Sequence, residues 1–154
     1  MTTTEVKKKY GEPNITGEGY LSTVILPFPM RLAWDTNQKI SKIRCHKLIT
    51  DNMTKAFDSV IKNYTYKQIV ELGIDLYGGV FNYRKMRNGS RLSMHSWGLA
   101  IDLDPANNQL KWGRDKARFA KEEYKPLMEA FYSNGFINLG VEKNYDWMHF
   151  EIAS

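Results

Sequence analysis

The sequence predicts one domain that combines helices with short strands. Its 154 residues are the size of one ordinary domain and can bury a core without the help of disulfides. Two stretches, about 46–62 and 115–134, carry apolar residues at the three- and four-residue spacing of helices. Two others, 99–104 and 149–153, alternate apolar and polar residues as strands do. No internal repeat or low-complexity linker divides the chain, so residues 1–154 are expected to form a single domain.

The composition excludes several classes of protein. Apolar residues make up 42% and charged residues 25%, a globular balance that argues against wholesale disorder. The single cysteine, Cys45, rules out a disulfide framework and a thiolate cluster, so a metal site must use nitrogen and oxygen ligands. No apolar run approaches the roughly 20 residues of a spanning helix, and the first residues lack the apolar stretch of a secretory signal. We therefore expect that the chain has no transmembrane segment. We also expect that it is made in the cytoplasm.

The charge balance is basic. Twenty-two Lys and Arg against seventeen Asp and Glu give a net charge of +5, which favours polyanionic partners. The densest basic stretch, 84–91, lacks the interleaved aromatic residues that are typical of nucleic-acid binding. A solvated basic face accounts for this charge, so we expect no nucleic-acid partner.

The N-terminal part of the chain is expected to be structural. Residues 1–19 are polar and show no periodicity, which predicts an extended arm lying on the domain. His46, at the start of the first apolar stripe, is interpreted as a surface or capping residue rather than a ligand. Two prolines within 26–34 prevent a regular helix and predict an extended segment with three side chains that cover the core, Phe28, Leu32 and Trp34.

The middle of the chain leads up to the stretches that carry chemistry. A short helix is expected over 66–73, followed by a tight turn at the glycines 78–79 and a strand over VFNYR, residues 80–84. The later helical region contains Pro126, which breaks or restarts the helix, and it stops near Asn134.

Two of the three histidines, His95 and His149, lie in stretches of the sequence that also carry carboxylates. In LAIDLD, residues 99–104, Asp102 lies on the face opposite the apolar side chains, and in HFEIA, residues 149–153, His149 does the same. If these two strands are neighbours, Asp102 and His149 share one surface. His95 lies seven residues before Asp102, and the intervening turn can bring its imidazole back over the strand.

This set of side chains suits a metal. Two imidazoles and one carboxylate, from His95, Asp102 and His149, form a suitable ligand set for a catalytic zinc ion that keeps a fourth position for water. Asp104 is a rival ligand on the same face, but the Pro105 that follows it favours a turn-capping role. From spacing alone, a structural hydrogen bond between His and Asp is the alternative to a metal.

Hydrolysis at such a metal also needs a base and a positive charge. Asp146, three residues before His149, can place its carboxylate beside the metal without binding it. Arg84, at the end of the predicted VFNYR strand, is the candidate to bind the substrate carbonyl or a nearby carboxylate.

The two motifs resemble those of a known group of enzymes. SMHSWGLAID, residues 93–102, is similar to the S-x-H-x-x-G-x-A-x-D signature of the LAS group of zinc peptidases, and DWMHFE, residues 146–151, looks like their second motif. The nearer branch contains the VanY-like D-alanyl-D-alanine carboxypeptidases and the phage L-alanyl-D-glutamate endopeptidases used as endolysins. GGVFNYRKMR, residues 78–87, also resembles the stretch ahead of the first motif, so the motif-bearing core is expected over 78–152.

The resemblance implies a fold and a set of roles. The fold would be α+β, of the Hedgehog/DD-peptidase-like kind, with a small, mostly antiparallel sheet flanked by helices and one zinc ion in an open groove. His95, Asp102 and His149 would bind the zinc, Asp146 would be the catalytic acid and base, and Arg84 would stabilise the substrate or the transition state. The Asp at the base position, where many carboxypeptidases have Glu, is also found in the endopeptidase branch.

Further residues are candidates for substrate binding. Ser93 would hydrogen-bond near the site, with an equal alternative of ordering the loop before His95. Four aromatic residues could line the groove, although packing in the core is the commoner role of such side chains: Tyr83, Trp97, Trp112 and Trp147.

The function expected from the sequence is a zinc-dependent peptidase, acting as a monomer on peptidoglycan stem peptides as a phage or prophage endolysin. Such an enzyme would act on the cell wall after release, in the host periplasm. The first alternative is a D-Ala-D-Ala carboxypeptidase, which must recognise a free C-terminal carboxylate. A further arginine in the groove would favour this alternative, and the sequence alone does not place Arg87 or Arg91 there. A second alternative is a zinc-bearing binding module without catalysis, against which Asp146 argues. A nucleic-acid-binding protein is suggested by charge alone.

Overall fold

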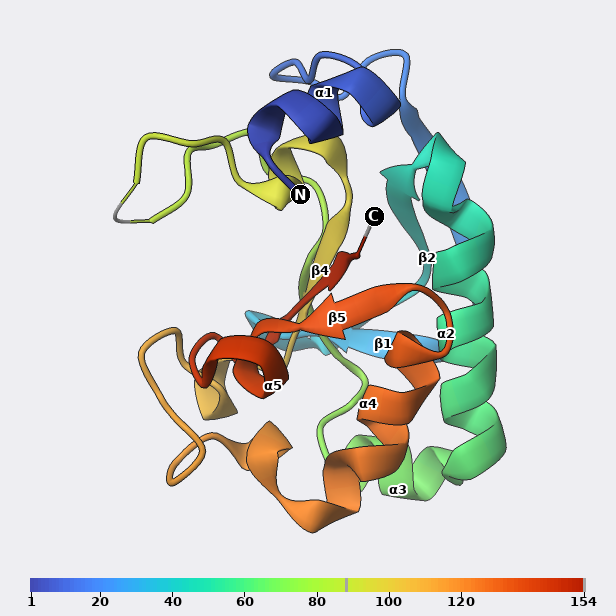
Figure 1. The fold of residues 1–154 in the computed structure, drawn as a ribbon. Helices are drawn as coiled ribbons and strands as arrows, with labels where there is room; N and C mark the ends of the chain where they lie inside the picture. The colour runs from blue at the N-terminus through green and yellow to red at the C-terminus, as the bar shows by residue number, and fades with distance from the viewer. Residues whose placement is uncertain (88, 154) are drawn as a thin grey trace.

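The computed structural model describes residues 1–87 and 89–153 and contains a six-stranded sheet packed against helices (Figure 1). The order of the strands across the sheet is β2-β1-β3-β4-β6-β5, and only β1 and β3 pair in parallel within the described part of the chain. The predicted α+β fold with a mostly antiparallel sheet is therefore confirmed. The strands are β1 (Leu21–Leu32), β2 (Asp35–His46), β3 (Leu76–Gly79), β4 (Ala100–Leu103), β5 (Phe136–Asn138) and β6 (His149–Ile152).

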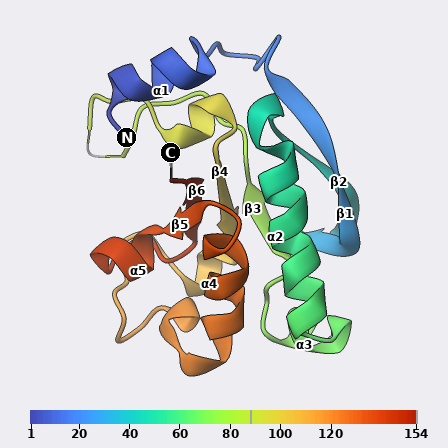
Figure 2. The same ribbon diagram turned by 45° about the vertical axis from the view of Figure 1, so that its right-hand side comes forward.

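Within residues 1–87 and 89–153, five α-helices and five short 3-10 segments accompany the sheet (Figure 2). The described helices are too short or too polar to cross a lipid bilayer. The α-helices are α1 (Thr3–Tyr10), α2 (Thr50–Asn63), α3 (Tyr66–Glu71), α4 (Lys125–Tyr132) and α5 (Leu139–Lys143). The 3-10 segments are η1 (Lys47–Ile49), η2 (Met94–Trp97), η3 (Pro105–Asn107), η4 (Arg118–Ala120) and η5 (Glu122–Tyr124).

An aromatic cluster joins α2 and α4 to the sheet. The ring of Phe131 on α4 lies 4.5 Å from Phe150 on β6, 5.3 Å from Phe136 on β5 and 5.5 Å from Phe57 on α2. All four side chains are buried. Because burying one such side chain stabilises a fold by about 1.5–3 kcal/mol, this cluster holds β6 firmly against the helices.

The N-terminal segment forms a helix and not the extended arm expected for residues 1–19. Helix α1 begins with a capping box in which the side chain of Thr2 accepts from the backbone N–H of Glu5. Val6 and Tyr10 are buried against the domain. Two apolar residues in an eight-residue helix are too few to show a period in the sequence, which explains the wrong prediction.

The extended segment predicted over 26–34 belongs to a long hairpin formed by β1 and β2. Phe28 is buried as expected, but Trp34, in the two-residue turn after Leu32, is exposed and does not cover the core. The sequence did not indicate β2, because this edge strand exposes most of its side chains and carries no apolar alternation.

The glycines at 78–79 mark a close strand pairing and not the predicted tight turn. They end β3, which pairs with β4, while residues 80–84, predicted as a strand, are irregular. A Cβ atom on Gly78 would lie 2.9 Å from the backbone oxygen of Asp102. Glycine is therefore required by the close approach of the two strands.

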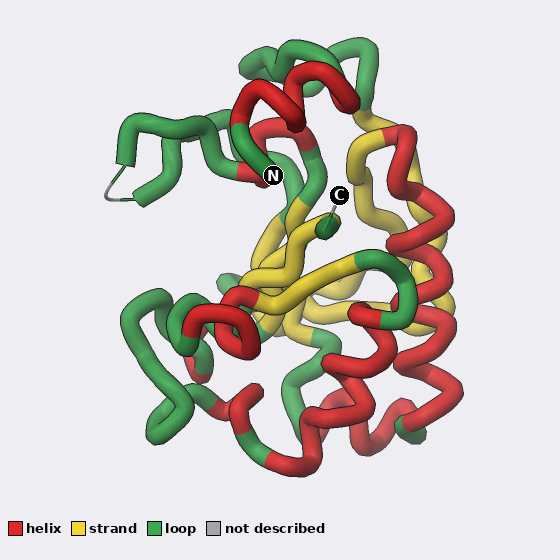
Figure 3. Tube along the Cα trace, in the orientation of Figure 1, coloured by secondary structure: helices red, strands yellow, loops and turns green. Residues whose placement is uncertain are grey.

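The helices predicted further along the chain form over shorter ranges. Helix α2 begins at Thr50, because η1 precedes it, and Leu48 in that segment is exposed. Helix α3 begins at Tyr66 as predicted and ends at Glu71, two residues before the predicted end at 73. In the region 115–134, only α4 is α-helical, and Pro126 lies in its first turn, where proline needs no hydrogen-bonded N–H. Figure 3 shows the long loops before η2 and after β4 projecting from the same side of the molecule.

Candidate metal centre

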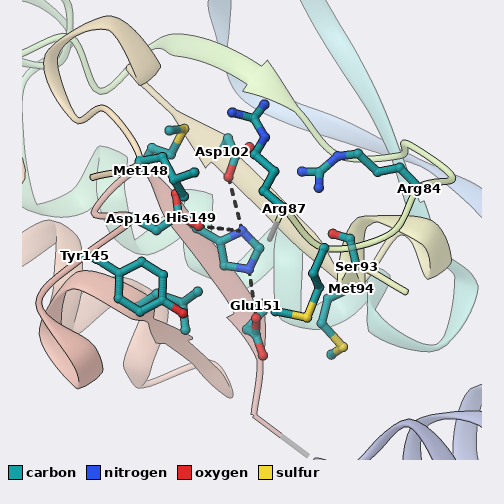
Figure 4. Close-up of a pocket in the computed structure, with 13 residues that line it drawn as sticks. Arg84, Arg87, Ser93, Met94, Asp102, Tyr145, Asp146, Met148, His149 and Glu151 are labelled. Atoms are coloured by element: carbon teal, nitrogen blue, oxygen red, sulfur yellow. Dashed lines mark hydrogen bonds and ion pairs between the residues drawn. The ribbon is translucent and has the colours of Figure 1, made fainter. Parts of the chain in front are cut away.

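Three side chains from two neighbouring strands and a 3-10 turn converge on one point. Asp102 on β4 pairs directly across the sheet with His149 on β6, and His95 comes from η2. One ligand atom from each residue lies within 4.8 Å of the other two. Asp102 Oδ2 is 3.2 Å from His95 Nε2. Asp102 Oδ1 is 3.3 Å from His149 Nδ1, the contact drawn between these two residues in Figure 4. The strand alternation in the sequence therefore placed Asp102 and His149 on one surface correctly.

The turn that carries His95 depends on residues of the first motif. The side-chain oxygen of Ser93 caps η2 by accepting from the backbone N–H of His95. Gly98 ends the turn in the left-handed region, with φ of 71°, and a Cβ atom there would lie 2.7 Å from Leu21 and 2.9 Å from the backbone nitrogen of His46. Only glycine suits this position, because both the backbone conformation and the space exclude a side chain.

Each imidazole is oriented by an acceptor on its other nitrogen. His95 Nδ1 lies 2.7 Å from the carbonyl oxygen of Val80, and His149 Nε2 lies 2.8 Å from Glu151 Oε1. Because a carbonyl oxygen can only accept, His95 carries a proton on Nδ1 and presents Nε2 towards Asp102. Such outer partners fix the ring orientation of metal-binding histidines.

The electrostatics of the centre favour a cation. Burial raises the pKa of Asp102, but the adjacent imidazoles of His95 and His149 outweigh this effect and hold that pKa well below its usual range. Burial opposes a charge on His149, yet the neighbouring carboxylates of Asp102 and Glu151 raise its pKa above the ordinary value. The carboxylates that attract a proton to His149 would equally attract a divalent metal ion, which would displace that proton.

The three side chains fit a zinc ion. His95 Nε2 and Asp102 Oδ1 are buried without a hydrogen-bond partner among the described residues, which is costly unless another group satisfies them. Two ligands of a tetrahedral zinc ion, each about 2.0–2.1 Å from the metal, lie about 3.4 Å apart. The shortest separations of Asp102 from the two imidazoles are close to this spacing, at 3.2 Å from Oδ2 to His95 and 3.3 Å from Oδ1 to His149, and one ligand atom from each of the three residues lies within 4.8 Å of the others.

Asp146 lies beside this centre in a strained turn. It has a positive φ of 55°, its N–H donates to the carbonyl oxygen of Leu110, and its own carbonyl oxygen accepts from the N–H of His149. Its carboxylate Oδ2 is 3.9 Å from His149 Nδ1. Burial raises the pKa of Asp146, and the nearby charges of His149 and Arg87 only partly offset this effect. The carboxylate is therefore placed to gain and lose a proton next to the candidate metal ligands.

The pocket over the centre brings two arginines together. Arg84 and Arg87 both line it, together with Ser93, Asp146 and Met148. In Figure 4, Tyr145 and Asp146 lie on one side of His149 and Arg84 on the other. The backbone of Arg84 is fixed by Ser96, whose hydroxyl accepts from the Arg84 N–H and donates to its carbonyl oxygen. Ser93 has both of the roles considered for it, because it lines this pocket and also caps the η2 turn that carries His95.

The aromatic residues predicted to line the groove mostly do not. Trp97 is buried, and its Nε1–H donates to the carbonyl oxygen of Gly11 beneath α1. Trp147 is also buried, packed on Gly140. Tyr83 is exposed and does not line the pocket over the metal centre. The sequence could not separate these cases, because alternation does not apply to the irregular segments that carry them.

Trp112 and Asp104 take positions next to the centre. Trp112 lines an adjoining hollow that shares Arg87 with the main pocket. Asp104, the rival ligand, is buried and forms an ion pair with Arg118, with Oδ2 2.7 Å from the guanidinium. It has a positive φ of 46° and accepts from the side chain of Asn107, which agrees with the predicted turn role.

Sequence reasoning did not assign Glu151 and Arg87 to the site. Glu151 orients His149, and the alternation of HFEIA already placed both on one strand face. Arg87 reaches the pocket from the irregular segment after β3, and no periodic signal could place it.

Comparison with known proteins gives one match. The model of a family described as D-alanyl-D-alanine carboxypeptidase matches residues 87–152, which contain the three candidate ligands, Asp146 and Glu151. Searches of curated proteins and of solved structures returned no significant match. The resemblance inferred from the two motifs is therefore confirmed over 87–152.

Proposed function

We propose that this metallopeptidase, which over residues 87–152 belongs to the M15 family of D-alanyl-D-alanine carboxypeptidases, is a zinc enzyme that cleaves peptidoglycan stem peptides as an endopeptidase. The observation that carries the proposal is the buried cluster of His95, Asp102 and His149 with the carboxylate of Asp146 beside it. A binding module would not need a base in that place.

The residues of the chain divide the work of hydrolysis. His95, Asp102 and His149 would hold the zinc ion, which when bound would supply a Lewis acid for the scissile carbonyl and lower the pKa of the attacking water. Asp146 takes a proton from that water as it adds to the carbonyl carbon, and later delivers the proton to the amine nitrogen when the C–N bond breaks. Arg84 faces the same pocket and offers its positive charge to the oxyanion.

The shape of the site supports internal cleavage of the peptide. The pocket over the metal centre continues into further hollows through shared residues, including Arg87 on one side and Met94 on another. A substrate can therefore extend in more than one direction. The endopeptidase would act as an endolysin of a phage or prophage, made in the cytoplasm and acting on the wall after release, and its net charge of +5 would help it to hold an anionic wall.

The test is product analysis on purified peptidoglycan. Wild-type protein is compared with the same protein treated with a chelator, with zinc restored, and with Asp146→Asn. We expect the chelator to abolish release of new amino termini, zinc to restore it, and Asp146→Asn to retain zinc while its kcat falls about 10²–10⁴-fold. Asp58→Asn, on α2, is the matched control and should behave as wild type. Zinc binding at one equivalent without cleavage of any wall preparation would contradict the proposal.

A carboxypeptidase activity is the second candidate, and the position of Arg87 favours it. Arg87 joins Arg84 in the pocket, and two guanidinium groups suit a free carboxylate. Mass spectrometry separates the two reactions, because a carboxypeptidase releases single D-alanine residues whereas an endopeptidase releases larger fragments. If Arg87→Ala impairs cleavage of a peptide with a free C-terminus but not of its amidated form, the carboxypeptidase is favoured.

A further inference from the structure

A second groove lies on the β1–β2 hairpin, outside the segment that matches the peptidase family. We call it the hairpin groove. Its lining combines aromatic and aliphatic side chains with polar and basic ones. Its principal residues are Trp34, Tyr77, Phe81, Thr23, Lys42 and Arg44.

The hairpin groove adjoins the metal centre through a series of neighbouring hollows that share lining residues. Trp34 and Phe81 line both the hairpin groove and a neighbouring hollow, and that hollow is also lined by the metal ligands His95 and Asp102. Arg84 connects this hollow in turn to the pocket that contains Asp146. A long substrate held at the metal centre can therefore continue along the hairpin.

Trp34 is held in an exposed position. It is 66% exposed, in the two-residue turn between the strands of the hairpin. The turn is anchored, because the N–H of Ala33 donates to the carbonyl oxygen of Tyr77 over 2.9 Å, and the Tyr77 ring lies 6.3 Å from that of Trp34. No hydrogen bond involves Trp34 Nε1 within the described residues. An exposed, anchored indole with a spare donor is typical of a binding site.

The basic side chains of the groove have no acidic partners. Among residues 1–87 and 89–153, neither Lys42 nor Arg44 forms an ion pair or a side-chain hydrogen bond, and the groove contains no carboxylate in its lining. Arg44 lies across from Thr23 in the hairpin, so two kinds of donor face outwards side by side. These donors suit a ligand rich in oxygen acceptors and attached to acidic groups.

We propose that the hairpin groove binds the glycan strand of peptidoglycan to which the stem peptide is attached. A sugar ring would lie against the indole of Trp34 with its C–H face, while Lys42 and Arg44 donate to hydroxyl and N-acetyl oxygens. The carboxylates of the stem peptides add to the attraction for the basic side. The inference rests on the proposed function, because it treats the groove as the place for the rest of the same substrate.

The experiment separates glycan binding from hydrolysis. Binding is measured by sedimentation of the Asp146→Asn protein with purified peptidoglycan, with and without Trp34→Ala. Hydrolysis is measured for the otherwise wild-type protein and its Trp34→Ala variant, on peptidoglycan and on a free stem peptide without sugars. We expect Trp34→Ala to weaken sedimentation and kcat/KM on peptidoglycan about tenfold, and to leave hydrolysis of the free peptide unchanged. Trp34→Phe should retain most of the binding.

Two matched controls sharpen the result. Ile25 is 65% exposed on the same hairpin but does not line the groove, so Ile25→Ala should bind as wild type. Lys42→Glu should weaken sedimentation more than Lys39→Glu, because Lys39 lies on β2 outside the groove lining.

Each outcome bears on one of the two claims. Unchanged sedimentation of Trp34→Ala, or equal losses from Lys42→Glu and Lys39→Glu, would overturn the glycan site and leave the peptidase untouched. If the wild type cleaves neither substrate, the proposed function fails, and Trp34-dependent sedimentation would then still support the glycan site by itself.

Discussion

His95 and His149 each have one ring nitrogen that points away from Asp102. In both residues this nitrogen lies next to an oxygen acceptor. For His95 the acceptor is a backbone carbonyl, which no substitution removes directly, but for His149 it is the side chain of Glu151. Glu151 is therefore the residue through which the orientation and basicity of a candidate ligand can be tested without touching any ligand.

We predict that Glu151→Gln weakens zinc binding about 10- to 100-fold, because the amide is a poorer acceptor for the Nε2 proton of His149. Competition with a chromogenic chelator measures the change in Kd. Glu123→Gln removes the same charge from an exposed position and serves as the control. An unchanged Kd in Glu151→Gln would show that the carboxylate does not support the metal centre.

Gly98 offers a second test at the scale of one residue. We predict that Gly98→Ala lowers the free energy of unfolding by about 2 kcal/mol or more, because a left-handed conformation and a crowded Cβ position both penalise a side chain. Gly19→Ala is the control, since Gly19 also has a positive φ but no atom within 4 Å of its Cβ position, and we expect a loss of about 1 kcal/mol. Urea unfolding measures both. Equal losses of unfolding free energy in the two variants would show that crowding at the Cβ position of residue 98 does not contribute.

Helix α1 is tied to the element that carries His95. The carbonyl oxygen of Tyr10, at its end, lies 3.1 Å from His46 Nε2, and the next carbonyl oxygen, of Gly11, accepts from Trp97 in η2. His46 in turn caps η1 by accepting from the N–H of Leu48. It is a capping residue, as the sequence suggested, but it is buried and not on the surface.

The buried position of His46 predicts a loss of stability in acid. Burial lowers its pKa and the charge of Lys47 adds to this, while the carbonyl oxygen of Tyr10 opposes it; the rings of Tyr10 and Tyr20 pack against the imidazole. The unfolded chain, with a pKa of about 6.5 at this position, therefore takes up the proton more readily than the folded protein. The neutral imidazole supports the fold above about pH 6.5, and this contribution is lost as the pH falls towards the lower folded pKa.

The measurement is urea unfolding of the zinc-loaded protein at about pH 7.5 and 5.5. The free energy of unfolding should fall more between these values in the wild type than in His46→Gln, which does not titrate in this range. An equal fall in both proteins would assign the acid sensitivity to other groups.

The elements that the sequence predicted are those in which one periodic face meets the core. The strands β4 and β6 and the helix α2 are of this kind. Two of the three candidate ligands lie on β4 and β6, so the sequence predicted them together with these strands. The irregular segments were not predicted, because the position of Arg87 or Trp97 depends on tertiary contacts and not on local period. Helix α1 and strand β2 were missed for the same reason, since each buries few of its side chains.

At the scale of the molecule, one hydrophobic core extends from the buried side chains of α1 to those of β6. Cys45 is fully buried within it, and burial raises the pKa of its thiol to about 12. We predict that Cys45 reacts with an aromatic disulfide reagent only when the domain unfolds, because both access and thiolate are lacking in the native state. The labelling rate should rise with urea in step with loss of tryptophan fluorescence. Fast labelling of the native protein would contradict this packing.

The direct pairing of Asp102 with His149 across β4 and β6 has a consequence for how such a protein can vary. Two of the candidate ligands are spaced by the geometry of a sheet, which is the same whatever length of chain runs from one strand to the next. The exposed part of the connection after β4, residues 114–116, can therefore accept a foreign insertion while the two strands keep their partners in register, provided that Leu110, whose carbonyl oxygen holds the turn of Asp146, stays in place.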